Sequence, residues 1–481
     1  MIRQNKIKNR SLILMFSVFA IIIFRFILTA TIPLLDKTEA RYGEIARIMA
    51  ETNEWIVLQI DYGVPFWAKP PLSTWLSALS FEAFGVNEMA ARLPSFLIAV
   101  GIVLLIGRIA KKEKNIPYYL SGFVLLTMPE FLLHSGVVST DSTLSLSVVL
   151  IMLSFWESLN SVKKTFWNYL FFIAVGLGLL AKGPIVLILT GPPIFIWCLL
   201  KKGRFKQVFT RLNWFIGIPV TAIVAIPWYV LVEQRSTGFT EYFFIGEHFK
   251  RFFEANWEGD LYGGPGSAPY GMIWIFLLIF AFPWVQIVLY SLWKNRKTIF
   301  KDSWISFLVL WFIWTPFFFT FSSNILHTYT LPSMIPVALL TAHFWNSYKK
   351  KNVLLGVAGF FPVIAFIAFA FFFIPGSLNE YLNTDKLLIQ NGQSIKSSQN
   401  TQVVFWKNVS YSGNFYTHGA ALSVSDMSDL NDVLQENNNV LLIVSKKKLD
   451  EIDQKILNKF QLVGSNYKTN SYLNLKDAKI Y

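Results

Sequence analysis

The sequence has little charge and almost no cysteine. Only 15% of its 481 residues are Asp, Glu, Lys or Arg, compared with about 25% in soluble proteins. Cys198 is the single cysteine, so neither a disulfide nor a cysteine metal cluster can form within the chain. No internal repeat at a fixed period is visible, which argues against a transporter built from repeats. The C-terminal part also has no nucleotide-binding glycine fingerprint and no metal-binding motif.

Apolar and aromatic residues are abundant instead. The chain is 54% hydrophobic and contains 45 Phe, with a mean hydropathy of +0.45, which is typical of a polytopic membrane protein. The net charge of +14 would favour nucleic acid in a soluble protein. Here Lys and Arg lie in short clusters between apolar runs, which is typical of a topology signal beside anionic headgroups. We therefore expect membrane lipids, and no nucleic acid, as partners.

Eleven apolar segments are each close to the ~20 residues that a membrane-spanning helix needs. They are 11–32, 91–110, 117–133, 142–158, 165–181, 184–200, 213–232, 270–292, 303–321, 328–346 and 353–374. The basic N-terminus favours an uncleaved first span that begins in the cytoplasm. The amphipathic segment 70–86 either lies on the membrane surface or crosses it. Only the surface position leaves every later basic cluster in the cytoplasm: 111–114, 163–164, 201–206, 294–297 and 349–351.

The composition changes after residue 374. Residues 1–374 predict an all-α polytopic membrane domain with about 11 transmembrane helices and juxtamembrane helices on its outer side. Residues 375–481 are polar, and short strand patterns alternate there with helical patterns. We therefore predict a small α/β domain outside the membrane, which acts as a lid or as a docking module for a partner.

The first outer loop follows the first apolar span and is rich in ionisable residues. A helical pattern starts at Thr38, and Asp36 and Glu39 lie near its beginning. A carboxylate at this position favours the helix dipole, so capping and catalysis are both open for these two residues. Arg41, a little further along, is a candidate for binding a phosphate.

Other outer turns contain further candidates. Lys69 precedes two prolines in a rigid turn, where it is either a point charge for a phosphate or an ordinary interfacial lysine. Asp141 begins an apolar span, as an N-cap or as a second carboxylate of the site. The remaining candidates in these turns are Tyr42, Lys182, His327 and Tyr329.

The long loop 233–269 contains Glu247, His248 and Arg251 among aromatic residues. Glu247 and Arg251 share one helical face. Such a segment is either a surface amphipathic helix or part of a site in which Arg251 binds a phosphate and His248 binds a metal or a carboxylate. Because all these turns are predicted on one membrane face, we expect a reaction between anionic, lipid-linked groups.

In their order along the chain, these residues resemble the GT-C-type membrane glycosyltransferases. More narrowly, they are similar to the bacterial branch near the protein O-mannosyltransferases that includes the lipid A aminoarabinose transferase. The likeness covers about residues 10–345. The motifs concerned are Glu39-Ala-Arg41-Tyr42, Lys69-Pro70, Asp141, Lys182-Gly183, Glu247-His248-x-x-Arg251-Phe252 and Thr328-Tyr329.

The resemblance implies a GT-C-like fold and an undecaprenyl-phosphate-linked sugar as donor. It implies inverting transfer to an envelope acceptor at the periplasmic face of the bacterial inner membrane. The donor phosphate would be held by Arg41, Lys69, Arg251 and Tyr329. Asp141, together with Asp36 or Glu39, would line the sugar or the acceptor.

Two positions depart from the family pattern. Thr38 stands where the family usually has Asp, so Asp36 or Glu39 must take the place of that carboxylate. Ala68 stands where the aminoarabinose branch often has an acid that helps to bind a metal. No cofactor is therefore assigned, and His248 is the candidate ligand for a divalent metal.

These observations lead us to expect a monomeric glycosyltransferase that transfers an amino sugar to lipid A, because an added amine reduces the negative surface charge. Three alternatives remain open. A protein or polysaccharide O-glycosyltransferase would have the same fold. A flippase or transporter of lipid-linked sugars would place charges at the bilayer midplane. A non-catalytic binding protein would use the C-terminal domain.

Overall fold

A computed structural model describes residues 2–114, 116–161, 166–254, 257–263, 268–322, 324–374, 376, 379–395, 401–437 and 439–474, with side chains from residue 12 onward. The basic cluster at 163–164 and the end of the chain from residue 475 lie outside the described residues.

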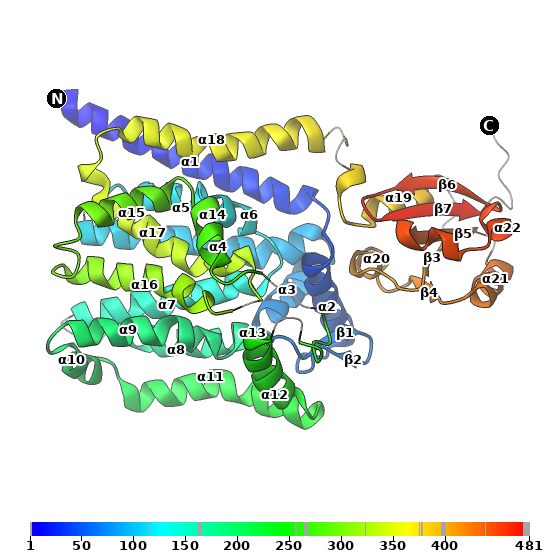
Figure 1. The fold of residues 1–481 in the computed structure, drawn as a ribbon, viewed down its shortest axis with the longest axis horizontal. Coiled ribbons are helices and arrows are strands. Elements are labelled where there is room, and N and C mark those ends of the chain that lie inside the picture. Colours follow the sequence, from blue (N-terminus) through cyan, green and yellow to red (C-terminus); the bar gives the residue numbers. More distant parts are fainter. Residues whose placement is uncertain are drawn as a thin grey trace.

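Long helices run side by side to form one bundle (Figure 1). Five of the described helices are long and apolar enough to cross a bilayer. They lie in α1 (Ile2–Thr31), α4 (Glu88–Lys114), α7 (Thr140–Asn160), α11 (Trp214–Arg235) and α18 (Lys351–Ala368), the last continuing into η4 (Phe369–Phe373). Shorter helices complete the bundle: α5 (Tyr118–Leu126), α6 (Pro129–His134), α8 (Phe166–Lys182), α9 (Ile185–Leu200), α10 (Arg204–Arg211), α14 (Met272–Phe280), α15 (Trp284–Lys294), α16 (Ser303–Phe319), η2 (His327–Thr330), α17 (Leu331–Phe344) and η3 (Trp345–Ser347).

Helix is present in each of the eleven predicted apolar segments, but two of these segments are broken. The segment 117–133 divides into α5 and α6, and 270–292 divides into α14 and α15, which are bent by 106°. Both breaks occur at a proline, Pro129 and Pro283, because proline cannot donate the hydrogen bond that continues a helix. The number of eleven spans stays a prediction.

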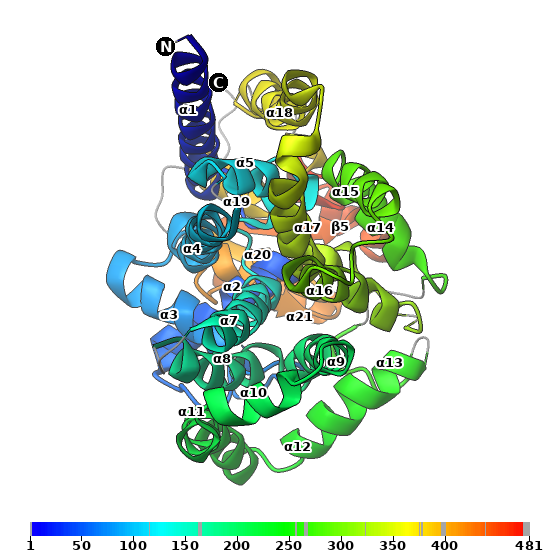
Figure 2. The ribbon, with the colours of Figure 1, turned by 90° about the vertical axis from the view of Figure 1, so that its left-hand side faces the viewer.

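The burial of the helices reflects their place in the bundle. The most apolar window of α7 is 89% buried, whereas that of α18 is only 11% buried although it is more apolar. An all-round apolar helix with an exposed surface is expected where lipid, rather than protein, is its neighbour. Figure 2, viewed along the bundle, shows α7 inside and α18 at the edge. The centre of the bundle is therefore protein core, and the outer helices present the apolar surface that is expected to face lipid.

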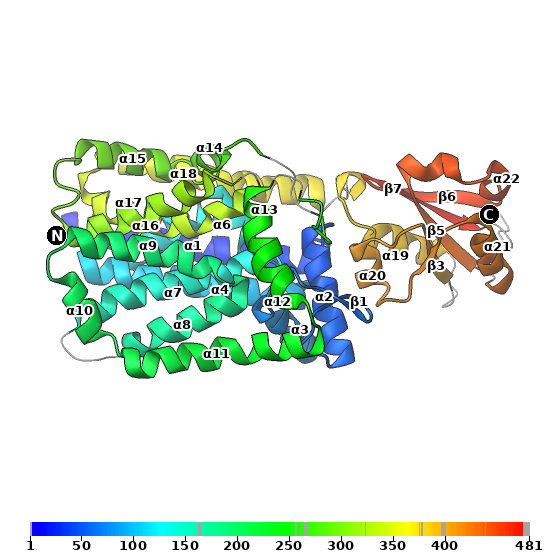
Figure 3. The same ribbon diagram turned by 60° about the horizontal axis from the view of Figure 1, so that its bottom comes forward.

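One end of the bundle is closed by short elements that lie outside the long helices (Figures 1 and 3). These are α2 (Thr38–Thr52), β1 (Gln59–Asp61), β2 (Val64–Pro65), α3 (Leu72–Phe84), α12 (Phe239–Glu241), η1 (Tyr242–Lys250) and α13 (Arg251–Phe253). They share a second apolar core, separate from that of the bundle, in which Ile45, Phe66 and Phe243 are buried. With 13 residues, α3 is shorter than the ~20 residues needed to cross a membrane.

A five-stranded sheet forms a small domain beyond this end. Its strand order is β4-β3-β5-β7-β6. Strand β3 is parallel to both β4 and β5, and β7 is antiparallel to β5 and β6. The elements are η5 (Asn379–Tyr381), α19 (Lys386–Ile395), β3 (Thr401–Trp406), α20 (Tyr411–Tyr416), β4 (Leu422–Val424), α21 (Met427–Glu436), β5 (Asn439–Ser445), η6 (Lys446–Glu451), α22 (Gln454–Leu457), β6 (Phe460–Ser465) and β7 (Thr469–Asn474).

The sheet domain is attached to the bundle through α20. The Tyr416 hydroxyl accepts a hydrogen bond from the Leu34 amide (2.7 Å) and donates one to Glu88 (3.0 Å). Lys386 also forms an ion pair with Glu88. These contacts place the sheet domain directly against α2 and the start of α4.

Candidate active site at the end of the bundle

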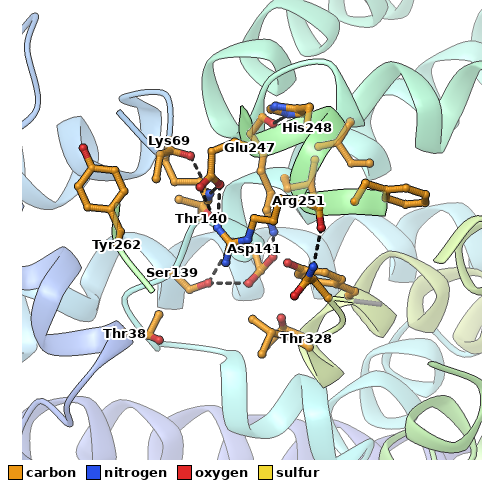
Figure 4. A pocket seen from close by; sticks show the side chains of 18 of the residues that line it. Thr38, Lys69, Ser139, Thr140, Asp141, Glu247, His248, Arg251, Tyr262 and Thr328 are labelled. Carbon is orange, nitrogen blue, oxygen red and sulfur yellow. Dashed lines mark hydrogen bonds and ion pairs between the residues drawn. The ribbon is translucent and has the colours of Figure 1, made fainter. Parts of the chain in front are cut away.

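A cavity of about 390 Å³ lies where α2, the turn at Lys69, the start of α7, the end of α8, η1, α13 and η2 meet (Figure 4). It lies beneath the short elements that close the bundle. Most of the site candidates predicted from the sequence line it: Arg41, Tyr42, Lys69, Asp141, Lys182, Glu247, His248, Arg251 and Tyr329. Residues that are up to about three hundred positions apart are thus brought to one place.

Glu247 joins two cations at one side of the cavity. Its carboxylate accepts from Lys69 Nζ (2.7 Å) and from Arg251 Nη1 (2.8 and 2.9 Å), as Figure 4 shows. Burial alone would raise the pKa of Glu247, but Lys69 and Arg251 outweigh it and hold this pKa below its ordinary value. The carboxylate is therefore ionised and keeps both cations in position while part of each remains exposed to the cavity, 17% for Lys69 and 19% for Arg251.

Asp141 and Lys182 form a second ion pair. Ser139 is the N-cap of α7: its hydroxyl accepts from the Asp141 amide (3.0 Å) and donates to the Asp141 carboxylate (3.1 Å). Lys182 ends α8, and its Nζ lies 4.6 Å from the centre of the Tyr329 ring. Ser139, rather than Asp141, is thus the N-cap of α7. The Asp141 carboxylate points instead toward Lys182 and the cavity.

Arg41 reaches the cavity from α2. One Nη donates to the Tyr262 carbonyl oxygen (2.9 Å), and the guanidinium lies over the rings of Phe66 and Tyr411 at 5.7 and 5.9 Å. The buried Nε has no hydrogen-bond partner among the described residues. Arg41 is among the residues that line the cavity, so its guanidinium places positive charge beside any anion that enters.

The two ring nitrogens of His248 face backbone carbonyl oxygens. Nδ1 lies 2.8 Å from Phe243 O, and Nε2 lies 3.2 Å from Lys182 O. Burial lowers the pKa of His248, which favours the neutral ring. The metal-binding role predicted for His248 stays a prediction.

Asp36 does not line the cavity. Its carboxylate accepts from the Ser412 amide (3.1 Å) and from the Ser412 hydroxyl, so it faces the sheet domain. Burial raises the pKa of Asp36 to about 6. Asp36, one of the two residues considered in place of the family's usual Asp, thus lies at the interface between the bundle and the sheet domain.

Glu39 also lies away from the cavity. It forms a bidentate pair with Arg92, in which Nε and Nη2 each donate at 2.7 Å, and it accepts from the Val138 amide (3.3 Å). Burial would raise the pKa of Glu39, but Arg92 outweighs this and lowers it. These contacts are those of a structural ion pair, because every partner belongs to the framework rather than to open space.

His327 is two residues from Tyr329, yet it points elsewhere. Its Nδ1 lies 2.8 Å from the Glu130 carboxylate, and its ring stacks on Phe280. The turn η2 thus sends Tyr329 into the cavity and His327 away from it.

Several lining residues were not foreseen. Thr38 occupies the position of the family's usual Asp and lines the cavity together with Lys37. The Tyr262 hydroxyl donates to Pro65 O and accepts from the Trp67 amide, both at 3.0 Å, and so holds the turn that carries Lys69. No motif signals this role, because Tyr262 lies in a loop without a regular pattern.

Asn324 supports Arg251 in a similar way. Its side-chain amide donates to Arg251 O (2.6 Å), at the start of α13, and to Glu254 O (3.0 Å), just after its end. An Asn-Ile-Leu turn gives no hint of this contact, since its partner lies more than seventy residues earlier.

The arrangement suits an anion. The cations lining the cavity outnumber the carboxylates, and neither carboxylate is left to repel an incoming negative group alone. Preorganised cations in a partly buried cavity stabilise charge that develops on a bound anion. The same cavity has an apolar side, formed by α9, α13 and α16, through Leu189, Phe252 and Phe319.

Comparison with known proteins reveals relatives of this chain. The family described as dolichyl-phosphate-mannose-protein mannosyltransferase matches residues 9–243. The undecaprenyl phosphate-alpha-4-amino-4-deoxy-L-arabinose arabinosyl transferase 1 of Pseudomonas fluorescens is 27% identical over 389 residues, which are 76% of this chain and 64% of that protein. A transferase of the same name from Erwinia tasmaniensis is 29% identical over 358 residues, 71% of this chain and 61% of that protein. The chain therefore matches less than two thirds of the length of these relatives.

Solved structures show the same fold. The crystal structure of ArnT from Cupriavidus metallidurans bound to undecaprenyl phosphate has a TM-score of 0.73 and 16% sequence identity, covering 96% of this chain and 98% of the other. The apo structure has the same TM-score and 15% identity. These comparisons confirm the resemblance to GT-C-type membrane glycosyltransferases, and with the apolar helices they indicate a multi-pass inner-membrane protein.

Proposed function

We propose that the protein is an inverting GT-C-type glycosyltransferase that moves an amino sugar from undecaprenyl phosphate to lipid A. The relatives named above are undecaprenyl phosphate-aminoarabinose transferases, which supports this donor class. The observation on which the proposal rests most is the meeting of Arg41, Lys69 and Arg251 in one cavity with Asp141.

The leaving group of such a donor is a lipid phosphate, which is already stable as an anion. No strong general acid is then needed, and the main requirement is positive charge around the departing oxygen atoms. Lys69 and Arg251, held by Glu247, supply this charge together with Arg41, which lines the same cavity. Tyr329 lies beside Lys182 and lines the same cavity, and we assign it a contact with the same phosphate.

Asp141 is the carboxylate that we assign to the acceptor side, in preference to Asp36 and Glu39. It lines the cavity, whereas Asp36 faces Ser412 and Glu39 pairs with Arg92. A phosphate acceptor, as on lipid A, is nucleophilic without a base, whereas a hydroxyl acceptor requires one. With lipid A as the acceptor, Asp141 orients groups and balances Lys182.

We further propose that the N-terminus is cytoplasmic and that the cavity and the sheet domain are periplasmic. This orientation leaves the basic loops inside, in agreement with the positive-inside rule. In the structure, the cavity elements and the sheet domain lie at the same end of the bundle (Figure 1), so one orientation accounts for both. The enzyme acts as a monomer in this proposal, since one chain supplies all the lining residues named above.

Mass spectrometry of lipid A tests the proposed acceptor. Strains with and without the gene should differ by one amino sugar on the phosphate groups of lipid A. Unchanged lipid A together with the loss of a protein or polysaccharide glycan would contradict lipid A as acceptor. Reconstituted protein that moves labelled donor across liposomes without transferring sugar would contradict the enzyme assignment itself.

Asp141→Asn separates the two kinds of acceptor. Removing a general base typically costs about 10²–10⁴-fold in rate. With a phosphate acceptor we expect a smaller loss and no change in the slope of rate against pH. A loss in that full range, with an acidic limb that disappears in the variant, would indicate a hydroxyl acceptor instead. The measurement is the turnover of purified enzyme with lipid A and the lipid-linked donor over a range of pH.

A further inference from the structure

Glu130, His134 and His327 form a cluster beside the cavity but outside it. Glu130 and His134 lie at the two ends of the short helix α6, and His327 begins the turn η2. The two elements are separated by almost two hundred residues in the sequence and are in contact in the fold. None of the three residues is among those that line the cavity described above.

The ligating atoms of this cluster converge on one point. His134 Nδ1 and His327 Nδ1 each lie 2.8 Å from the same carboxylate oxygen of Glu130. One possible ligand atom from each residue lies within 4.8 Å of the others. A tetrahedral zinc ion with bonds of 2.0–2.2 Å needs ligand atoms about 3.4 Å apart. A small widening of the two contacts would therefore admit an ion between the three side chains.

The burial of Glu130 calls for a positive partner. Its side chain is fully buried, and it pairs with two imidazoles. A buried carboxylate is costly unless it is paired with positive charge or binds a metal. A divalent ion bound between the three side chains would supply positive charge to Glu130 and would use both rings as neutral ligands.

The ring of His327 is also held in its orientation. It stacks on Phe280 with 5.1 Å between ring centres, and the His134 ring lies edge to face with it at 5.5 Å between ring centres. The His327 side chain is 42% exposed, which leaves a path for an ion and for a water ligand. Two His and one Glu with an open fourth position form a donor set that zinc prefers.

We propose that Glu130, His134 and His327 bind one divalent transition-metal ion of the zinc class. The ion joins α6 to η2 and so fixes the turn that directs Tyr329 into the cavity. The site is separate from His248 and does not depend on the identity of the donor or the acceptor. It involves no change in the oxidation state of the metal.

Metal binding to the full-length protein, purified in detergent without a histidine tag and treated with a chelator, tests this proposal. We expect wild-type protein to bind one equivalent of Zn²⁺ and to give the absorption bands of His-ligated Co²⁺ when Co²⁺ is added instead. Glu130→Gln and His327→Asn each remove a direct ligand, so each should weaken binding by more than the ~10–100-fold that the loss of an outer-shell partner costs. Zn²⁺ should raise the Tm of wild-type protein and leave that of both variants unchanged.

Two histidine variants serve as controls. His418→Asn changes an exposed histidine of the sheet domain and should bind Zn²⁺ like wild type. His248→Asn changes the cavity histidine and should also retain the site. Binding that is lost in His248→Asn but kept in Glu130→Gln would overturn the proposal. Wild-type protein that binds no more Zn²⁺ than Glu130→Gln would overturn it as well. If Glu130→Gln folds poorly, the same comparisons of Zn²⁺ binding are made with His327→Asn, which also removes one ligand.

Discussion

Helix α2 separates two groups of charges that differ in their surroundings. On one side, Glu39 and Arg92 form a pair in which the side chains are only 9% and 4% exposed. On the other side, Arg41 faces the cavity, where Lys69 and Arg251 keep a larger exposed fraction. The first pair has all its hydrogen bonds made within the protein, and the second group retains donors that face open space. Charged groups whose hydrogen bonds are all made within the protein hold the structure together. Charged groups that keep part of their surface open to a cavity can bind a ligand.

The strongest test of this comparison is Arg92→Ala. The change leaves the Glu39 carboxylate buried without its partner, which should lower the free energy of unfolding by about 3–5 kcal/mol. Thermal or denaturant unfolding in detergent measures the loss. Arg235→Ala is the matched control, because its pair with Glu54 is 54% and 29% exposed and should contribute at most about 1 kcal/mol. Equal stability of the two variants would remove the distinction drawn here.

Arg251→Ala should lower activity strongly and stability only slightly, which is the opposite of the result expected for Arg92→Ala. We expect its rate of sugar transfer to fall by about 10²–10³-fold, because a cation next to the departing phosphate is lost. Its Tm should change much less than that of Arg92→Ala, since Lys69 still pairs with Glu247. Donor turnover and Tm are measured on the same preparation, again with Arg235→Ala as the control. Turnover at the wild-type level would exclude Arg251 from the site.

Asp36→Asn tests the contact between the bundle and the sheet domain. Burial raises the pKa of Asp36 to about 6, whereas an aspartate in the unfolded chain titrates at about 3.9. Between these values the folded protein binds more protons than the unfolded chain, so stability should fall as pH rises from about 4 to about 6. The variant should lack this decrease, which is at most about 3 kcal/mol. The exposed Asp450→Asn should keep it, and a wild-type curve that rises over this window would contradict the interpretation.

Lys69→Arg is expected to have the smallest effect near neutral pH. Burial lowers the pKa of Lys69, and Glu247 opposes this only in part. Wild-type donor binding should therefore be lost on the alkaline side at a lower pH than a free lysine would allow. Arginine stays charged above pH 12, so the variant should move this alkaline limb to higher pH. The profile of kcat/KM against pH gives the measurement, and an unchanged limb would assign it to another group.

Much of the cavity could be predicted from the sequence because its residues stand in local motifs. The proline turn places Lys69, and the spacing of four residues joins Glu247 to Arg251 even though the segment around Glu247 is a π-helix. The apolar runs likewise predict where helix occurs. The breaks at Pro129 and Pro283 were less evident, since an apolar run of sufficient length looks the same whether it is straight or bent.

Local motifs could not predict which of the two first-loop carboxylates, Asp36 or Glu39, would line the cavity. Asp36 and Glu39 both lie near the start of α2, and either could face the cavity if the helix were rotated. Their partners, Ser412 and Arg92, are distant in the sequence, so no local pattern indicates which way each side chain points. The contact of His327 with Glu130 could not be predicted either, because these two residues are also far apart in the sequence.

By itself, the sequence determined the class of protein, the helical segments and the charged residues available for chemistry. These follow from composition and short-range periodicity, which act on neighbouring residues. Only the tertiary structure decided which charges share a cavity and which are consumed in pairs. That outcome depends on contacts between residues far apart along the chain. A buried charge is costly without a partner, and the fold determines which oppositely charged residue lies close enough to pair with it.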